Sequence, residues 1–263
     1  FGSPEPFFQK GFWSPKAFLF MNILIDLQHP AHLHVFRHAV ERWRREGHRV
    51  LITGRDEDIL VQLAEKYGIE MTVFGKAEKG FFNLARELIF RQRRLNKIIK
   101  QFKPDVMMAV AGTFISLLGW LRRIPVYIFY DTEHATMSNL LAYPFSTCIY
   151  VPRCYRKPIR WKHVRYNGYH ELAYLRPGYF EPDVSVLKEV GVNPNQVFTL
   201  IRLVGWGAGH DIGLSGLTPE NKIRAIEVFE AFGPVFISSE GPLPPELETY
   251  RLNLDITRIH SFM

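Results

Sequence analysis

Four of the chain's ten histidines lie within ten residues, in the stretch DLQHPAHLHVFRH that runs from Asp26 to His38. His34 and His38 are four residues apart, a spacing that brings two imidazoles onto one helix face, where they could bind zinc. The glutamate of an HExxH zinc motif is missing between them, and both lie two residues from the apolar Phe36, on the face away from the core. We therefore interpret His34 and His38 as surface residues and expect no metal.

His29 and His32 come earlier in the same stretch, in the loop between an apolar run and the helix. One interpretation is structural: these are polar loop residues that cap the N-terminus of the helix. The other is chemical, because an imidazole has a pKa near neutral pH and can act as a general base or contact a substrate. The sequence leaves both interpretations open for His29 and His32.

A second polar group follows a later apolar run, in the stretch YDTEHA. Asp131, Glu133 and His134 place two carboxylates and an imidazole within four residues. Such side chains could orient sugar hydroxyls, act as a base or bind a metal. They could equally cap the helix that is expected to follow, over ATMSNLLAY.

A glycine-rich stretch, RLVGWGAGHD, follows another apolar run. Gly205, Gly207 and Gly209 would let backbone amides approach a phosphate, with Arg202 as the charge partner. The spacing is not GxGxxG, and the loop after the first apolar run, QHPAHLH, contains no glycine. These departures exclude the dinucleotide motif of NAD-binding proteins.

Two basic regions are interleaved with aromatic and apolar residues. One is a helix expected from about residue 81 to 102, and the other is the stretch RCYRKPIRWKHVR. A solvated surface accounts for both, although a basic amphipathic helix can also lie on an anionic membrane. No nucleic-acid-binding module is recognisable, so no nucleic-acid partner is expected. The basic residues of the helical region are Arg86, Arg91, Arg93, Arg94, Lys97, Lys100 and Lys103.

The amino-acid composition indicates the class of protein to which the chain belongs. With 47% apolar and 22% charged residues among 263, the chain has the balance of a globular protein rather than a disordered one. Its two cysteines, Cys148 and Cys154, form no disulfide framework and suit the reducing cytoplasm. No apolar run reaches the roughly 18 residues that a membrane span needs. The net charge of +7 favours anionic partners.

Apolar runs of strand length alternate with helical patterns from Met21 onward, which predicts a doubly wound, Rossmann-like parallel sheet over residues 21–168. Ligands of such sheets bind beyond the carboxyl ends of the strands, where the polar loops described above are expected to lie. The six expected strands are NILIDL, RVLITG, IEMTVFG, DVMMAVAG, IPVYIFYD and TCIYVP.

The rest of the chain divides into three segments. Residues 169–196 contain prolines and glycines and are expected to be a linker with one short helix. The pattern restarts over 197–263, with strands VFTLIRL and PVFISSE and helices from Thr218 and over PPELETYRL. This segment is interpreted as the truncated start of a second α/β domain. Residues 1–20 have neither a helical nor a strand period and are expected to be a disordered or non-native leader.

Several of these stretches resemble an uncharacterised GT-B-like family of archaea and bacteria that is defined by a domain of unknown function. The resemblance extends from Met21 to the end of the chain. It is carried by MNILIDLQHPAHLHVFRH, DVMMAVAG, YDTEHA, RLVGWGAGHDIG and FISSEG. More distantly, the chain is similar to the N-acetylglucosaminyltransferases that make lipid-linked peptidoglycan precursor, and to UDP-N-acetylglucosamine 2-epimerases.

The resemblance implies a GT-B-like fold and a nucleotide-sugar substrate, with the donor bound mainly by the second domain and the acceptor against the first. It also implies chemistry without a cofactor or metal. His29 or His32 would lie near the reacting carbon, and Asp131 or Glu133 would be the alternative base. The remaining residues that it implies are, for donor phosphate, Arg202, Gly205, Gly207, Gly209, His210 and Asp211, and, for the substrate cleft, His134, Ser239 and Glu240.

The leading hypothesis is a glycosyltransferase that uses a nucleotide-sugar and an anionic or lipid-linked acceptor, in the cytoplasm and with peripheral contact to the inner membrane face. A transferase needs a base for the acceptor hydroxyl and neutralisation of the leaving diphosphate, and the polar loops supply both. The alternatives are a UDP-sugar 2-epimerase on the same fold, a non-catalytic carbohydrate- or nucleotide-binding protein, and a metal hydrolase that uses the histidine loop. The fragment alone is expected to be inactive.

Overall fold

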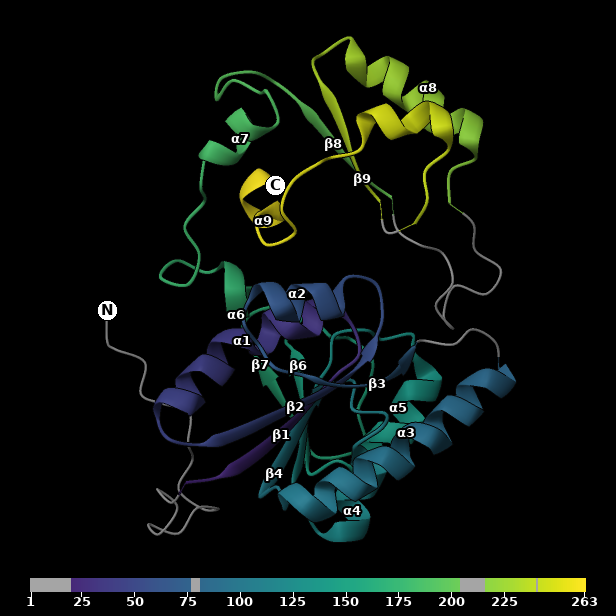
Figure 1. Ribbon diagram of the computed structural model, residues 1–263. Coiled ribbons are helices and arrows are strands. Elements are labelled where there is room, and N and C mark those ends of the chain that lie inside the picture. Colours follow the sequence, from purple (N-terminus) through teal and green to yellow (C-terminus); the bar gives the residue numbers. More distant parts are fainter. Residues whose placement is uncertain (1–19, 77–80, 204–215, 240) are drawn as a thin grey trace.

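The computed structural model describes residues 20–76, 81–203, 216–239 and 241–263 (Figure 1). The expected leader, apart from Phe20, lies outside these ranges. So do the glycine-rich stretch after Leu203 and the single residue Glu240.

A seven-stranded parallel sheet forms the centre of the N-terminal part, in the order β3-β2-β1-β4-β5-β6-β7. The six predicted strands correspond to β1 to β6. β7 was missed, because its alternating polar residues lie in a stretch that we interpreted only as a basic surface. The strands are β1 (Asn22–Leu27), β2 (Arg49–Asp56), β3 (Thr72–Lys76), β4 (Val106–Val110), β5 (Val126–Phe129), β6 (Cys148–Pro152) and β7 (His163–Tyr166).

Helices cover both faces of this sheet (Figure 1). α1 (Pro30–Arg45) and α2 (Leu60–Lys66) lie on one face, and α3 (Phe81–Phe102), α4 (Ser116–Arg122) and α5 (Thr136–Ala142) lie on the other. The residues of β1 show why both faces are covered. Ile23 and Ile25 pack into the core beneath α1 and α2, whereas Leu24 packs into the core beneath α3 and α4. Alternate residues of a strand point to opposite faces, so a strand that is apolar throughout needs cover on both. The predicted doubly wound sheet is confirmed.

A second, two-stranded parallel sheet lies in the C-terminal part, with β8 (Thr199–Leu203) paired to β9 (Val235–Ser239). Helix α8 (Pro219–Glu230) packs on it and begins as expected, because the Thr218 hydroxyl accepts a hydrogen bond from the Asn221 N–H at 3.3 Å. The α-helix predicted over PPELETYRL is instead a 3-10 helix, η2 (Pro245–Tyr250). The segment is only six residues long, and short helical pieces of this kind commonly take the tighter 3-10 form.

The remaining elements are short. The 3-10 helix η1 (Tyr143–Phe145) follows α5 and packs on α4 and α5, whereas α6 (Leu172–Leu175), α7 (Ser185–Glu189) and α9 (Ile259–Phe262) come after the seven-stranded sheet, and α7 packs against α9. α6 packs against α1, and the Lys66 ammonium at the end of α2 contacts the Asp255 carboxylate at 2.6 Å. Among the helices that the structure describes, none combines the length and the apolarity required to cross a membrane.

Gly112, after β4, is a position where the backbone requires glycine. Its φ is +75°, and a Cβ atom there would lie 2.3 Å from Cγ2 of Ile128. We expect Gly112→Ala to lower the free energy of unfolding by about 2–4 kcal/mol, from backbone strain and overpacking together. Gly68→Ala is the matched control, because its φ is +63° but no atom lies within 4 Å of the added Cβ. Urea unfolding of both variants measures the difference, and equal losses would contradict the steric account.

Candidate functional site

The order of the strands in the seven-stranded sheet indicates where a ligand would bind. β1 is followed by a helix on one face and β4, its neighbour, by a helix on the other, so the chain diverges after these two strands. Open parallel sheets bind their ligands at this topological switch point, beyond the carboxyl ends of the strands. Four side chains gather at this edge, from the loops after β1, β5 and β7 and from the first turn of α1, which contains His32 although we expected that residue in the loop. We call His29, His32, Asp131 and His170 the carboxyl-edge cluster.

His29 is the N-cap residue of α1. Its Nδ1 accepts a hydrogen bond from the Ala31 N–H at 3.2 Å, and its Nε2 lies 3.8 Å from the Asp58 carboxylate. The capping interpretation is therefore correct for His29. A substrate contact through Nε2 remains a prediction.

His32 lies 6.0 Å from His29, measured between ring centroids. Burial lowers the pKa of His32 to about 3, with further lowering by His29 and His170, so the ring is neutral at physiological pH. Its Nδ1 accepts a hydrogen bond from the Gln28 N–H at 3.2 Å. In the neutral ring the proton is therefore on Nε2. His32 is placed to donate a hydrogen bond rather than to accept a proton.

Asp131 and His170 are hydrogen-bonded at the same edge. Asp131 follows β5 and is 43% exposed, whereas the His170 side chain is 8% exposed. His170 Nδ1 lies 3.2 Å from Oδ2 of Asp131, and the Thr132 hydroxyl donates to Oδ1. The hydrogen bond from His170 is the largest cause that holds the pKa of Asp131 below its usual range. Asp131 is thus an ionised and accessible carboxylate, held in place by a buried imidazole.

Glu133 and His134 make different contacts from those of Asp131. The Glu133 carboxylate accepts a hydrogen bond from the Arg156 N–H at 2.7 Å, which ties it to the loop after β6. His134 is exposed, and its backbone carbonyl accepts a bond from the Thr136 N–H. The alternative that these residues cap the next helix is wrong, because the N-cap of α5 is Ala135 without a side-chain hydrogen bond.

Of the residues predicted to bind donor phosphate, only Arg202 is described. It lies on β8, and its charge is one of the causes, after burial and Arg37, that lower the pKa of His260 on α9. Ser239 ends β9, and its hydroxyl donates to the Gly241 carbonyl at 2.9 Å. The other predicted residues, Gly205, Gly207, Gly209, His210, Asp211 and Glu240, lie outside the described residues.

A buried ion pair lies beneath the loop that carries the histidines. Asp26 and Arg91 are both fully buried, and the Arg91 guanidinium lies 3.2 Å from Asp26 Oδ1 and 4.3 Å from the centroid of Phe114. Thr53 donates a hydrogen bond to the same oxygen at 2.8 Å. Our interpretation that all the basic residues of α3 lie on a solvated surface is therefore wrong for Arg91. It sits on the apolar stripe with Leu95, and it pairs with the acidic residue that ends the first apolar run.

His34 and His38 also differ from the prediction that they are surface residues. His34 is 7% exposed, and its ring packs against Tyr174 and His260, with ring centroids 5.0 and 4.7 Å away. The His38 side chain is 19% exposed and packs against Tyr179. Both histidines are buried by tertiary contacts, because α6, α9 and the segment between α6 and α7 cover this face of α1. Within the described part of the chain, no group of three or more His, Cys, Asp or Glu residues is placed to hold a metal ion.

Burial of His34 predicts a loss of stability in acid. Its pKa is lowered to about 3 in the folded state, mainly by burial, against an ordinary value of 6.5. Below pH 6.5 the unfolded chain binds more protons, so stability falls as the pH falls toward 3. The expected slope from this residue is about 1.4 kcal/mol per pH unit. Urea unfolding at pH 7 and pH 5 should show a shallower dependence in His34→Phe than in the wild type, and identical dependences would contradict the assignment.

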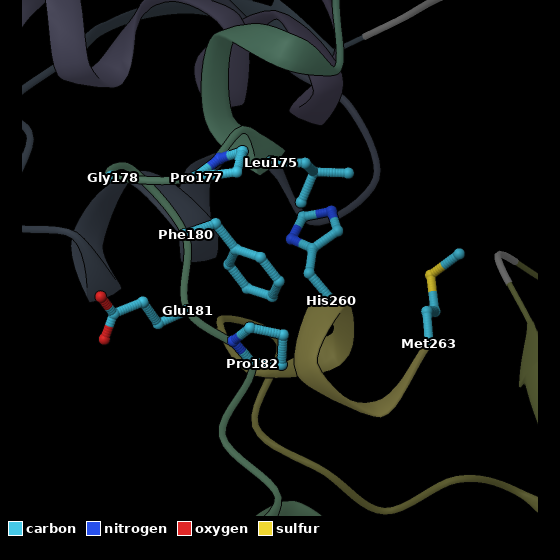
Figure 2. Close-up of a pocket in the computed structure, with 8 residues that line it drawn as sticks. All are labelled: Leu175, Pro177, Gly178, Phe180, Glu181, Pro182, His260 and Met263. Carbon is cyan, nitrogen blue, oxygen red and sulfur yellow. The ribbon is translucent and has the colours of Figure 1, made fainter.

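Figure 2 shows a pocket of about 590 Å³ between α9 and the segment after α6. His260 faces into it, whereas the carboxylate of Glu181 points away from the imidazole. The lining contains no residue of the carboxyl-edge cluster and presents no acid–base pair. It consists of Leu175, Pro177, Gly178, Phe180, Glu181, Pro182, His260 and Met263.

His170 is the site residue that sequence reasoning missed. It lies four residues after β7, and parallel strands all end at the same edge of a sheet, so recognition of β7 would have placed it near Asp131. The signal was the short alternating run HVRY, which was hidden in a stretch rich in lysine and arginine.

Comparison with known proteins gives a family match over most of the chain. Residues 21–204 match the family described as "Protein of unknown function (DUF354)". A relative from Methanocaldococcus jannaschii, "Uncharacterized protein MJ0665", is 28% identical over 183 residues, which are 65% of this chain and 53% of the relative. The chain therefore spans about half the length of the curated relative that it matches.

Several solved structures share the fold. A UDP-GlcNAc 2-epimerase from Neisseria meningitidis has a TM-score of 0.61 and 13% identity, over 87% of this chain and 68% of its own. A putative UDP-N-acetylglucosamine 2-epimerase from Listeria monocytogenes has a TM-score of 0.62 and 12% identity, over 92% and 72%. The spinosyn rhamnosyltransferase SpnG has a TM-score of 0.53 and 16% identity, over 87% and 67%. At these identities the likeness is one of fold, and the predicted GT-B-like fold is confirmed.

Proposed function

We propose that this chain, which belongs to the DUF354 family and has a GT-B-like fold, is part of a glycosyltransferase that uses a nucleotide-sugar donor. The observation that carries the proposal is the Asp131–His170 pair at the carboxyl edge of the sheet, beside the neutral His32. It supplies an accessible anionic acceptor for a proton next to a hydrogen-bond donor. The shared fold with a rhamnosyltransferase and with UDP-GlcNAc 2-epimerases supports an enzyme of sugar nucleotides.

In the proposed reaction, the oxygen of an acceptor hydroxyl forms a bond to the anomeric carbon of the donor sugar. The bond between that carbon and the phosphate oxygen breaks, and the nucleoside diphosphate leaves with the electron pair. Asp131 accepts the proton of the hydroxyl as the bond forms. His170 keeps the carboxylate ionised and oriented, as its hydrogen bond to Asp131 indicates.

The other polar residues take supporting roles in this proposal. His32 and His29 would donate hydrogen bonds to sugar or acceptor oxygens, each through its Nε2 atom. The Nδ1 atom of each ring is not free to do so, because it already accepts a hydrogen bond from a backbone N–H. Glu133 is a weaker candidate for the base, since its carboxylate is bound to the Arg156 N–H. The diphosphate would be neutralised by Arg202 and by the glycine-rich loop that follows it.

The acceptor in this proposal is anionic or lipid-linked, and no nucleic acid takes part. The charge of the chain supports this choice. Residues 81–165 contain 15 Lys and Arg but only four Asp and Glu, a net charge of +11, whereas the rest of the chain has a net charge of −4. A negatively charged acceptor would be drawn toward the N-terminal part, which we assign to the acceptor side.

An epimerase is the second candidate, because two of the structures with the same fold are described as UDP-GlcNAc 2-epimerases. The two reactions differ in their need for an acceptor. We would incubate the full-length gene product with UDP-GlcNAc, with and without a membrane-lipid extract, and follow the sugar and the diphosphate by NMR. Release of UDP that depends on the extract is expected for the transferase.

The other outcomes of this experiment are equally informative. A change of configuration at carbon 2 without an extract would identify an epimerase instead. No conversion of UDP-GlcNAc with or without the extract, together with measurable binding of UDP-GlcNAc, would favour a non-catalytic binding protein. Asp131→Asn is the matched variant, and it should slow the UDP release by about 10²-fold or more if the carboxylate accepts the proton.

A further inference from the structure

An exposed apolar patch with a basic border lies away from the carboxyl-edge cluster, on helices α4 and α5. Trp120 and Leu121 at the end of α4 are 58% and 61% exposed, and Met137 and Leu140 on α5 are 64% and 55% exposed. α4 packs against α5, and the Trp120 ring contacts Phe145, 5.6 Å away between centroids, just after α5. The exposed apolar side chains therefore lie on two helices that pack against each other.

The border of this patch is positively charged. Arg123 is exposed directly after α4. Arg122 donates to the Asn96 side chain at 2.8 Å, which joins α4 to α3. Arg93 and Lys100 are exposed and lie three residues before and four residues after Asn96, so they share its side of α3.

Acidic residues are missing from the segments that build the patch. Residues 106–130 and 134–170, which contain α4 and α5, include no Asp or Glu, and the acidic residues nearest to these helices in the chain are Asp105 before β4 and Asp131 and Glu133 in the loop before α5. A surface of this composition, apolar at its centre and cationic at its border, repels a cationic partner and complements an anionic one with an apolar interior.

We propose that the surface formed by Trp120, Leu121, Met137, Leu140 and Leu141, with Arg93, Lys100 and Arg123 at its border, docks the protein on an anionic lipid bilayer. Aliphatic and Trp side chains enter the boundary between headgroups and acyl chains, while Arg and Lys pair with lipid phosphates. Single-stranded nucleic acid is the weaker fit, because its bases stack on aromatic rings, whereas four of the five central side chains are aliphatic or Met. The proposal is independent of the enzymatic proposal.

The test is co-sedimentation of the full-length gene product with vesicles of phosphatidylcholine, with and without about 30 mol% phosphatidylglycerol. The protein should sediment with the anionic vesicles only, and it should be released at about 0.5 M salt. The variants L121D/L140D and R93E/K100E should each weaken binding about tenfold or more. All four residues are exposed, so thermal melts close to that of the wild type should show that the fold is kept.

Matched controls make the same changes on another surface. Val228 and Phe232 are exposed at and just after α8, so V228D/F232D adds two carboxylates away from the patch, and Arg224→Glu reverses a charge on α8. Both controls should keep vesicle binding. No binding to the anionic vesicles, or equal binding by the patch variants, would overturn the proposal. Binding of a single-stranded oligonucleotide through the patch, without binding of vesicles, would also overturn it. The same holds if the protein does not bind vesicles and instead forms a dimer that L121D/L140D dissociates.

Discussion

Arg91→Met is expected to lower the free energy of unfolding by about 3–5 kcal/mol, the largest stability effect of any single substitution considered for this protein. The guanidinium is fully buried and forms an ion pair with Asp26, which is fully buried as well. Burial raises the pKa of Asp26, and Arg91 and Thr53 act against this effect. Removal of Arg91 leaves an uncompensated carboxyl group in the core, on the strand that leads directly to His29. Urea unfolding measures the loss.

The double variant D26N/R91M is the control for this prediction. It removes both charges and keeps an amide oxygen to accept the hydrogen bond that Thr53 now donates to Asp26 at 2.8 Å. Because the cost of Arg91→Met comes from the unpaired carboxyl group, the double variant should recover most of the lost stability. Equal destabilisation by the single and double variants would show that Arg91 acts through packing on Phe114 rather than through its charge.

Asp131→Asn is expected to reduce turnover by about 10²- to 10⁴-fold, because it removes the proposed proton acceptor without a large change in shape. Substitution of His170 tests how that carboxylate is held. His170→Leu should raise the pKa of Asp131, since the hydrogen bond that lowers it is lost while the burial that raises it remains. Turnover should fall about tenfold or more, mainly in kcat, by analogy with the loss of an orienting partner in metal sites.

His170→Asn separates this positioning role from a general packing role. The amide of asparagine can place a donor where the imidazole Nδ1 is, and so it can keep the bond to Asp131. Titration of the Asp131 carboxyl by carbon-13 NMR needs no substrate. The pKa should stay low in His170→Asn and rise in His170→Leu. An unchanged pKa in both variants would remove His170 from the site.

Much of the fold could be predicted from the sequence, because parallel strands buried on both faces are apolar throughout, as NILIDL and DVMMAVAG are. The edge strand β7 could not be recognised in the same way. Its alternating HVRY pattern is short and lies among basic residues, so the strand and the His170 loop after it were missed together.

The site residues that sequence reasoning misplaced depend on contacts between distant segments. His34 is buried because α6 and α9 cover α1, and nothing within the helix shows this. Arg91 carried a local signal that was overlooked, since it lies on the buried stripe of α3 with Leu95 and Ile99. The position of Asp131 at the ligand edge could be predicted, whereas its buried partner could not, because the two residues are 39 positions apart.

The nucleotide-sugar site is tested by a calorimetric titration of the full-length gene product with UDP, with and without EDTA, alongside other nucleoside diphosphates. We expect binding in the micromolar range, about −8 kcal/mol, that survives the chelator. Arg202→Ala should weaken it, because the loop after β8 is proposed to hold the diphosphate. No binding of any nucleoside diphosphate, or binding that EDTA abolishes, would contradict the assignment of a metal-independent nucleotide-sugar site.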